Sequence, residues 1–242
     1  LAADAPRDRY ADWNAFVRFG ELADPKATMP LTVAGSDAAK ALATALADLG
    51  LDVATTLITE LDDLAPYVVI EQPPSETAQP EDDVSSQPVP ERGLIVVSEG
   101  MGLSELHALN ERAVVVGASV LYTQLAGVEF AVGPYVVPGS TACYWEVERQ
   151  RARTAFSYSE YMVLTSAPGR RGTVPPVAQR TFVATALPHA VELALLGHSS
   201  LAGSVLRGRA TTGETSRHRV MRLPRCPVCL PNRPLLRNLL YG

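Results

Sequence analysis

The fold prediction starts from one stretch, Leu31-Thr32-Val33-Ala34-Gly35-Ser36-Asp37-Ala38-Ala39. Its first five residues are typical of a short buried strand that runs into a turn of small residues. Ser36 or Asp37 can cap the helix that follows, and Gly50 ends that helix. Residues 51–57 then fit a second strand. A strand, a helix and a strand in this order predict a parallel sheet with a right-handed crossover, as in Rossmann-like α/β proteins.

The rest of the chain continues this α/β pattern. Further strands are expected at 66–70, 94–97, 114–121 and 128–137. Helices are expected at 10–22, at 102–113, directly after Cys143, and at roughly 177–196 with an interruption near Pro188. The coarse prediction is therefore one α/β domain over residues 31–231.

Three segments differ in kind from this domain. Residues 1–30 hold one helix and are expected to form a helical arm. Residues 71–92 contain five prolines and six acidic residues, which is typical of a flexible acidic, Pro-rich loop. Residues 232–242 form an apolar C-terminal tail, which we expect to pack against a partner or a second copy of the chain.

Composition excludes several function classes. The chain has 242 residues, of which 47% are hydrophobic, and a net charge of −5, which argues against nucleic acid as the main partner. No window is apolar for long enough to span a membrane, and no signal-peptide pattern opens the sequence. Three cysteines, two of them closely spaced, suit a reducing compartment, so a cytoplasmic location is expected.

The turn around Gly35 lies where a nucleotide-binding fold carries its Gly-x-Gly-x-x-Gly pattern. Only one of these glycines is present, and Asp37 adds a negative charge where a phosphate would lie. Thr55 and Thr56 stand where an acidic residue would hold the ribose. The sequence thus predicts a fold that keeps this geometry without binding a nucleotide.

The cysteines predict a metal site. Cys226-Pro227-Val228-Cys229 has the two-residue gap that directs both sulfurs to one tetrahedral ion, as in structural zinc sites. Cys143 is followed after the same gap by Glu146, a carboxylate in place of a second sulfur. The residues leave three readings open: a zinc site completed by Glu146 or by His218 or another histidine, a cluster without metal, or redox chemistry.

No catalytic residues are expected. The histidines at 107, 189, 198 and 218 are scattered, and none pairs in sequence with a nucleophile. Ser98-Glu99-Gly100-Met101-Gly102 is rich in glycine but lacks the spacing of a nucleophile elbow.

Two cysteine-bearing motifs carry a family resemblance. Residues 132–144, with Gly133-Pro134 and Val137-Pro138-Gly139-Ser140-Thr141-Ala142-Cys143, resemble the signature Gly-Pro-…-Val-x-Pro-Gly-x-Thr-Ala-Cys of the cyclodehydratase partner proteins of azole-forming peptide biosynthesis. The closing stretch 218–229 resembles the end of the same family, and residues 103–110 look like its helix before the later strands. The resemblance covers about residues 31–231.

This resemblance implies a fold similar to ThiF and ubiquitin-activating enzymes, with a degenerate nucleotide site and a C-terminal zinc knuckle. In the family, two pairs of cysteines make a four-thiolate zinc site. Carried over, the metal ligands are Cys143, Cys226 and Cys229, with Glu146 in the fourth position. Members commonly hold the leader peptide on an N-terminal winged-helix element. Residues 1–30 are expected to be either a helical arm or a remnant of that element, which is otherwise lost or lies on missing residues or on another protein, so no leader-binding site is placed on named residues.

The function that the resemblance implies is that of a non-catalytic scaffold subunit. Such a subunit presents a ribosomal precursor peptide to a YcaO-type cyclodehydratase, which uses ATP to form thiazoline or oxazoline rings in antibiotic biosynthesis. The expected partners are that cyclodehydratase and the precursor leader, and a homodimer is a further candidate. Two alternatives remain: an active ThiF-like adenylating enzyme and a Rossmann-fold oxidoreductase.

Overall fold

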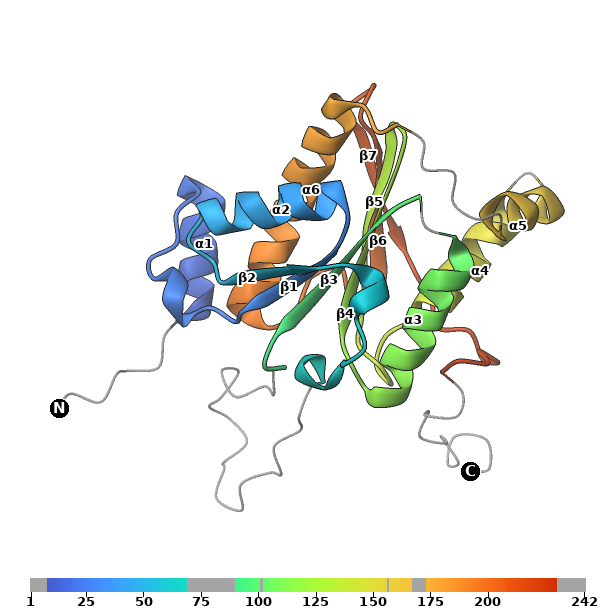
Figure 1. The fold of residues 1–242 in the computed structure, drawn as a ribbon, viewed down its shortest axis with the longest axis horizontal. Helices are drawn as coiled ribbons and strands as arrows, with labels where there is room; N and C mark the ends of the chain where they lie inside the picture. The colour runs from blue at the N-terminus through green and yellow to red at the C-terminus, as the bar shows by residue number, and fades with distance from the viewer. Residues whose placement is uncertain (1–7, 69–89, 101, 156, 167–172, 230–242) are drawn as a thin grey trace, which may run out of the picture.

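A seven-stranded mixed sheet forms the centre of the molecule. The computed structural model describes residues 8–68, 90–100, 102–155, 157–166 and 173–229. The strands lie in the order β2-β1-β3-β4-β5-β6-β7 (Figure 1). Their bounds are β1 Leu31–Gly35, β2 Val53–Thr56, β3 Gly93–Glu99, β4 Val120–Ala126, β5 Glu129–Val136, β6 Ser204–Arg209 and β7 Glu214–Arg219. Strands β2 to β4 pair in parallel, whereas β4 to β7 pair antiparallel.

Helices cover both faces of this sheet (Figure 1). Their bounds are α1 Arg9–Phe19, α2 Asp37–Asp48, α3 Leu103–Val116, α4 Tyr144–Thr154, α5 Tyr158–Ser166 and α6 Pro176–Leu196. Side chains of α2 and α6 fill one core together with alternate strand residues such as Leu31 and Val33. The intervening residues, such as Ala34, face a second core that contains α3 and the start of α4. Successive side chains of β1 point to opposite faces of the sheet, so this one short apolar strand contributes to both cores.

The strand–helix–strand unit is confirmed by the structure. β1 has the predicted bounds, α2 follows directly, and β2 pairs with β1 in parallel register. Ser36 precedes α2, but its side chain makes no bond to the helix backbone. Its hydroxyl donates instead to the carboxylate of Glu99.

Two of the predicted strands are wrong in part. Residues 66–67 belong to a 3₁₀ turn, Ala65–Tyr67, and Val68 makes only an isolated bridge to Ala118, while residues 69–70 lie outside the described residues. The run 114–116 is the last turn of α3, because Val114 is buried whereas Val115 and Val116 face solvent. Gly117, whose backbone adopts the left-handed conformation, ends that helix, and the strand begins at Val120.

Helix α6 is continuous through Pro188, contrary to the predicted interruption. Proline removes one backbone hydrogen bond and costs about 3 kcal/mol inside an isolated helix. Here Ala186 and Ala190 on either side are buried in the first core, together with Val191 and Leu193. Tertiary packing thus outweighs the local preference. Helix α5 and strand β6 are further elements that the sequence pattern did not predict.

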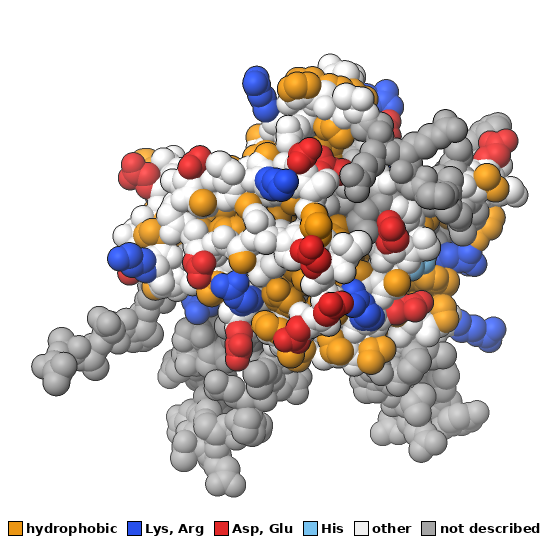
Figure 2. All heavy atoms as spheres, in the orientation of Figure 1, with side chains coloured by type: hydrophobic (Ala, Val, Ile, Leu, Met, Phe, Trp, Pro, Cys, Tyr) orange, Lys and Arg blue, Asp and Glu red, His pale blue; other side chains and the backbone are white. Residues whose placement is uncertain are grey.

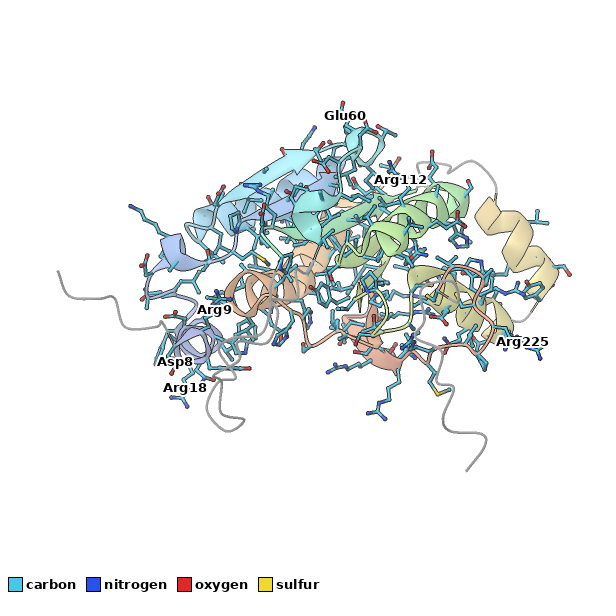
Figure 3. All side chains as sticks on the ribbon, turned by 90° about the horizontal axis from the view of Figure 1, so that it is seen from below. Asp8, Arg9, Arg18, Glu60, Arg112 and Arg225 are labelled. Carbon is cyan, nitrogen blue, oxygen red and sulfur yellow. The ribbon has the colours of Figure 1, made fainter. Side chains whose placement is uncertain are left out.

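The N-terminal helix packs on the main body. Trp13 and Phe16 of α1 stack on each other and lie against the first core, next to α6. Figure 3 places Asp8 and Arg9 at the opposite end of the molecule from Arg225. The predicted acidic loop lies outside the described residues except for its last three, and the apolar tail 232–242 lies wholly outside them.

The described helices do not include one that is both long and apolar enough to cross a membrane. On the face shown in Figure 2, acidic and basic side chains alternate over the surface and do not separate by sign.

Gly35 is required by the close approach of two strands. A Cβ atom at this position would lie 2.4 Å from the carbonyl oxygen of Val97 and 2.8 Å from the Cβ of Ala39. Neither atom can move without shifting β3 or α2. We therefore expect Gly35→Ala to lower the free energy of unfolding by about 2–3 kcal/mol, as overpacked core substitutions do.

Urea unfolding checks this prediction, with Ser36→Ala as the control in the same turn. That control removes one hydrogen bond and adds no atom, so its loss should be about 1 kcal/mol. An unchanged midpoint for Gly35→Ala would contradict the packing argument.

Candidate metal centre

The structure brings the four sequence-predicted ligand residues together. One ligand atom from each of Cys143, Glu146, Cys226 and Cys229 lies within 4.8 Å of all the others. The Sγ atoms of Cys143 and Cys226 are 3.7 Å apart, and the Sγ of Cys229 lies 3.7 Å from Oε2 of Glu146. All four side chains are at most 5% exposed. Two segments far apart in sequence thus meet in a closed cluster.

Helix α4 positions the first two members of this cluster. Cys143 is the N-cap residue of α4, and Glu146 occupies its third position. The Glu146 carboxylate accepts the backbone N–H of Cys143 at 2.9 Å, which satisfies a donor that the helix itself leaves without a partner. The turn before α4 is fixed by Thr141, whose Oγ1 accepts the N–H of Val137 at 2.8 Å.

The same glutamate also holds the C-terminal segment. Its other oxygen accepts the backbone N–H of Leu223 at 2.6 Å. One turn further along α4, the amide of Gln150 donates to the carbonyl of Met221 at 2.7 Å and accepts the N–H of Met221 at 3.2 Å. These bonds hold residues 221–223 against α4 and so deliver the Cys226–Cys229 turn to Cys143.

Within that turn, the N–H of Cys229 donates to the Sγ of Cys226 at 3.4 Å. Backbone N–H groups aimed at sulfur stabilise negative charge there, as second-layer contacts do in metal sites. The three thiols also perturb one another. A hydrogen bond from Cys229 lowers the pKa of Cys143 to about 6, whereas burial raises the pKa of Cys226.

The geometry and the donor set fit a tetrahedral ion. With zinc–sulfur bonds of about 2.3 Å, two sulfurs in a tetrahedral site lie about 3.8 Å apart, which agrees with the Cys143–Cys226 separation. Thiolates together with one carboxylate suit zinc better than magnesium or calcium, which prefer oxygen ligands throughout. Four buried ligands would leave no open position, which is the arrangement of a structural site. The same four residues would hold the ion and tie α4 to the C-terminal segment.

Asn110 is a contributor that the sequence did not reveal. Its Oδ1 accepts the backbone N–H of Tyr144 at 3.0 Å, so it caps α4 from the facing helix α3. It is fully buried and its hydrogen bonding also lowers the pKa of Cys143. A buried polar residue on an otherwise apolar helix face is the signal that could have identified it.

His218, the other fourth ligand considered, does not belong to this cluster. It lies on β7, where its Nε2 is 2.8 Å from Oγ of Ser216. Among the described residues, the cluster of ligand atoms contains only the three cysteines and Glu146.

The turn between β1 and α2, where a nucleotide-binding fold would bind phosphate, already contacts a carboxylate of the protein itself. Oε2 of Glu99, at the end of β3, accepts the N–H of Ala38 at 3.0 Å and the hydroxyl of Ser36. These donors form the N-terminus of α2, where a phosphate would bind in a dinucleotide-binding protein. The carboxylate of Asp37 lies exposed beside them. A phosphate in this position would have to displace Glu99 and approach Asp37.

Comparisons with known proteins support the fold. No model of a known protein family matches the chain, and no curated protein matches it either. A structure of the heterocyclase TruD matches with a TM-score of 0.57 and 22% identity, over 83% of this chain and 27% of that chain. A heterocyclase in complex with substrate and cofactor matches with a TM-score of 0.60 and 20% identity, over 95% of this chain and 29% of that chain.

A third structure, the E. coli microcin synthetase McbBCD complex, matches with a TM-score of 0.54 and 12% identity, over 90% of this chain and 76% of that chain. At these identities the likeness establishes the fold. This chain spans less than a third of the length of the two heterocyclase chains. The structural likeness expected from the cysteine-bearing motifs is confirmed, since heterocyclases and a microcin synthetase complex share this fold.

The metal content of the purified chain checks the site directly. We expect about one zinc per chain, the stoichiometry of a single four-ligand site. Cys226→Ser and Glu146→Gln should both lose it, because each removes a ligand atom of the cluster. His218→Ala is the matched control and should retain full zinc. Loss of zinc in that control, or its retention in Cys226→Ser, would contradict the assignment.

The two hydrogen bonds between Gln150 and the backbone of Met221 lead to a separate prediction. Gln150→Ala removes both hydrogen bonds to Met221, each worth about 1 kcal/mol, so the segment next to it should open more often. Hydrogen exchange of the Leu223 amide should accelerate by about tenfold or more. Gln179→Ala, which removes an exposed bond to the carbonyl of Asp37, should leave that exchange unchanged. Equal exchange in the two variants would mean that Glu146 and the knuckle hold the segment without help.

Proposed function

We propose that this chain is a non-catalytic scaffold subunit that presents a ribosomal precursor peptide to a YcaO-type cyclodehydratase. The observation that carries the proposal is the fold shared with heterocyclases and with a microcin synthetase complex over most of this chain. The resemblance of the two cysteine-bearing motifs to cyclodehydratase partner proteins supports the same function. The product would be thiazoline or oxazoline rings in a peptide of the antibiotic class.

The structure of the metal centre supports a scaffold role. A catalytic zinc keeps one position open to water or substrate, whereas this cluster is closed and buried. Zinc bound by Cys143, Glu146, Cys226 and Cys229 would therefore stabilise the attachment of the C-terminal segment. It would supply folding energy and take no part in ring formation.

The blocked turn at α2 supports the assignment of ATP chemistry to a partner. Glu99 and Asp37 place two carboxylates at the N-terminus of α2, which disfavours a triphosphate there. An adenylating enzyme or a dinucleotide-dependent oxidoreductase would need that position. In the proposed complex, the YcaO-type protein binds ATP and forms the rings, and this chain orients the peptide.

Reconstitution with the cognate YcaO-type protein and its precursor peptide tests this function. We expect the peptide to lose one water per ring, followed by mass spectrometry, only when both proteins and ATP are present. The chain alone should give no ring formation and no ATP–pyrophosphate exchange. Pyrophosphate exchange by the chain alone would favour the adenylating enzyme, and equal activity without the chain would contradict the scaffold role.

A variant of the metal centre distinguishes a scaffold role of this centre from a catalytic role. Cys226→Ser should weaken co-purification with the YcaO-type protein and lower ring formation in parallel, because the knuckle region would lose its order. An excess of the variant chain should then restore part of the activity. Complete loss of activity that excess protein does not restore would place the metal in the chemistry instead.

A further inference from the structure

A second site lies on the sheet, away from the metal ligands. Strands β4 to β7 and the end of α4 line an open cavity of about 480 Å³. Ala126 and Ala131 are among its lining residues, and their small side chains leave room above the sheet. Arg151 of α4 and Arg207 of β6 both line it. We call this cavity the arginine pocket.

Arg151 has partners within the protein. Its Nη1 donates to Oε1 of Gln124 at 3.1 Å and lies 3.7 Å from Oε1 of Glu148, a buried carboxylate. Its guanidinium also lies over the ring of Tyr161, at 5.7 Å from the centroid. Gln124 is itself fixed, because its amide nitrogen donates to the hydroxyl of Tyr144. This arginine is thus held in place and its charge is balanced.

Arg207 is half-buried and has no such balance. Its Nε is buried without a hydrogen-bond partner, and no ion pair joins it to another described residue. Desolvation lowers its pKa, and the neighbouring charge of Arg151 acts in the same direction. Two guanidinium groups therefore share one buried carboxylate, Glu148. Because the Nε of Arg207 is shielded from solvent, an anion could pair with this guanidinium only through the Nη atoms, where it would supply the missing charge partner.

The rim of the pocket indicates which anion fits. Arg209 is already paired with Glu129 at 2.6 Å, and Glu214 lines the pocket beside them. With Glu148 beside Arg151 and the carboxylates of Glu129 and Glu214 lining the pocket, a dianion such as phosphate would meet more repulsion than a single carboxylate. Ser216, opposite Arg207 in the register of β6 and β7, also lines the pocket, and its hydroxyl is hydrogen-bonded to Nε2 of His218 at 2.8 Å.

We propose that the arginine pocket binds the carboxylate of an acidic residue in a peptide, between Arg207 and Arg151. Guanidinium groups bind carboxylates with paired, charge-assisted hydrogen bonds, which gives geometric selectivity. Only the origin of this carboxylate in a precursor peptide rests on the proposed function. The assignment of the pocket itself rests on the cavity, on the guanidinium of Arg207 that no ion pair joins to another described residue, and on the charges around it.

Titration of the chain with two short peptides tests the pocket. The probes are acetyl-Ala-Glu-Ala-amide and its glutamine counterpart, and the readout is the ¹⁵N–¹H signal of Arg207 Nε. We expect saturable shifts with the glutamate peptide only, and at least tenfold weaker binding in Arg207→Gln. The control is Arg219→Gln, on the opposite face of β7, which makes the same charge change and should bind as wild type.

A stability measurement distinguishes binding from a structural role. Since Arg207 lacks a partner, Arg207→Gln should unfold at the same temperature as wild type or higher, whereas loss of a structural arginine would lower that temperature. Equal binding of the two peptides, or unchanged binding in Arg207→Gln, would overturn the proposal. Tighter saturation by inorganic phosphate than by the glutamate peptide would overturn the choice of a carboxylate. This experiment needs no cyclodehydratase, so its outcome is independent of the proposed function.

Discussion

The carboxylate of Glu146 is the contact on which the attachment of the segment after β7 to α4 depends. One oxygen completes the N-terminus of α4, and the other accepts an amide from the returning chain at Leu223. A cysteine at this position would offer one acceptor atom where the carboxylate offers two separate ones. Glu146 therefore combines two tasks in one side chain, capping of α4 and completion of the candidate metal cluster.

Helix α4 links the two sites of the molecule. Its first turn carries Cys143 and Glu146, and its last two turns carry Glu148 and Arg151, which line or support the arginine pocket. Gln150 lies between them and holds the segment that follows β7. Disorder of the cysteine cluster would therefore also disturb the position of Arg151 in the pocket, because both belong to α4. The proposed scaffold function would use such an arrangement, because a bound peptide and a bound partner could be held in a fixed relation.

The sequence predicted those parts of the structure whose local pattern and tertiary role agree. The short apolar run at 31–35 forms the predicted buried strand, and the spacing of Cys226 and Cys229 brings their two sulfurs into one cluster. The prediction was wrong where packing decided the outcome, as for the valines at 114–116 and for Pro188 inside α6. The arginine pocket could not be foreseen, because its residues come from separate strands and a helix that only the sheet register brings together.

The side chain of Glu99 also decides what the start of α2 can bind. In dinucleotide-binding proteins the donors at such a helix N-terminus bind phosphate, whereas here an internal acid from the neighbouring strand engages them. Removing Glu99 alone would leave Asp37 at the same helix end, and removing Asp37 alone would leave Glu99 in place. Because neither single change removes both carboxylates, opening this helix end to a phosphate would take two substitutions.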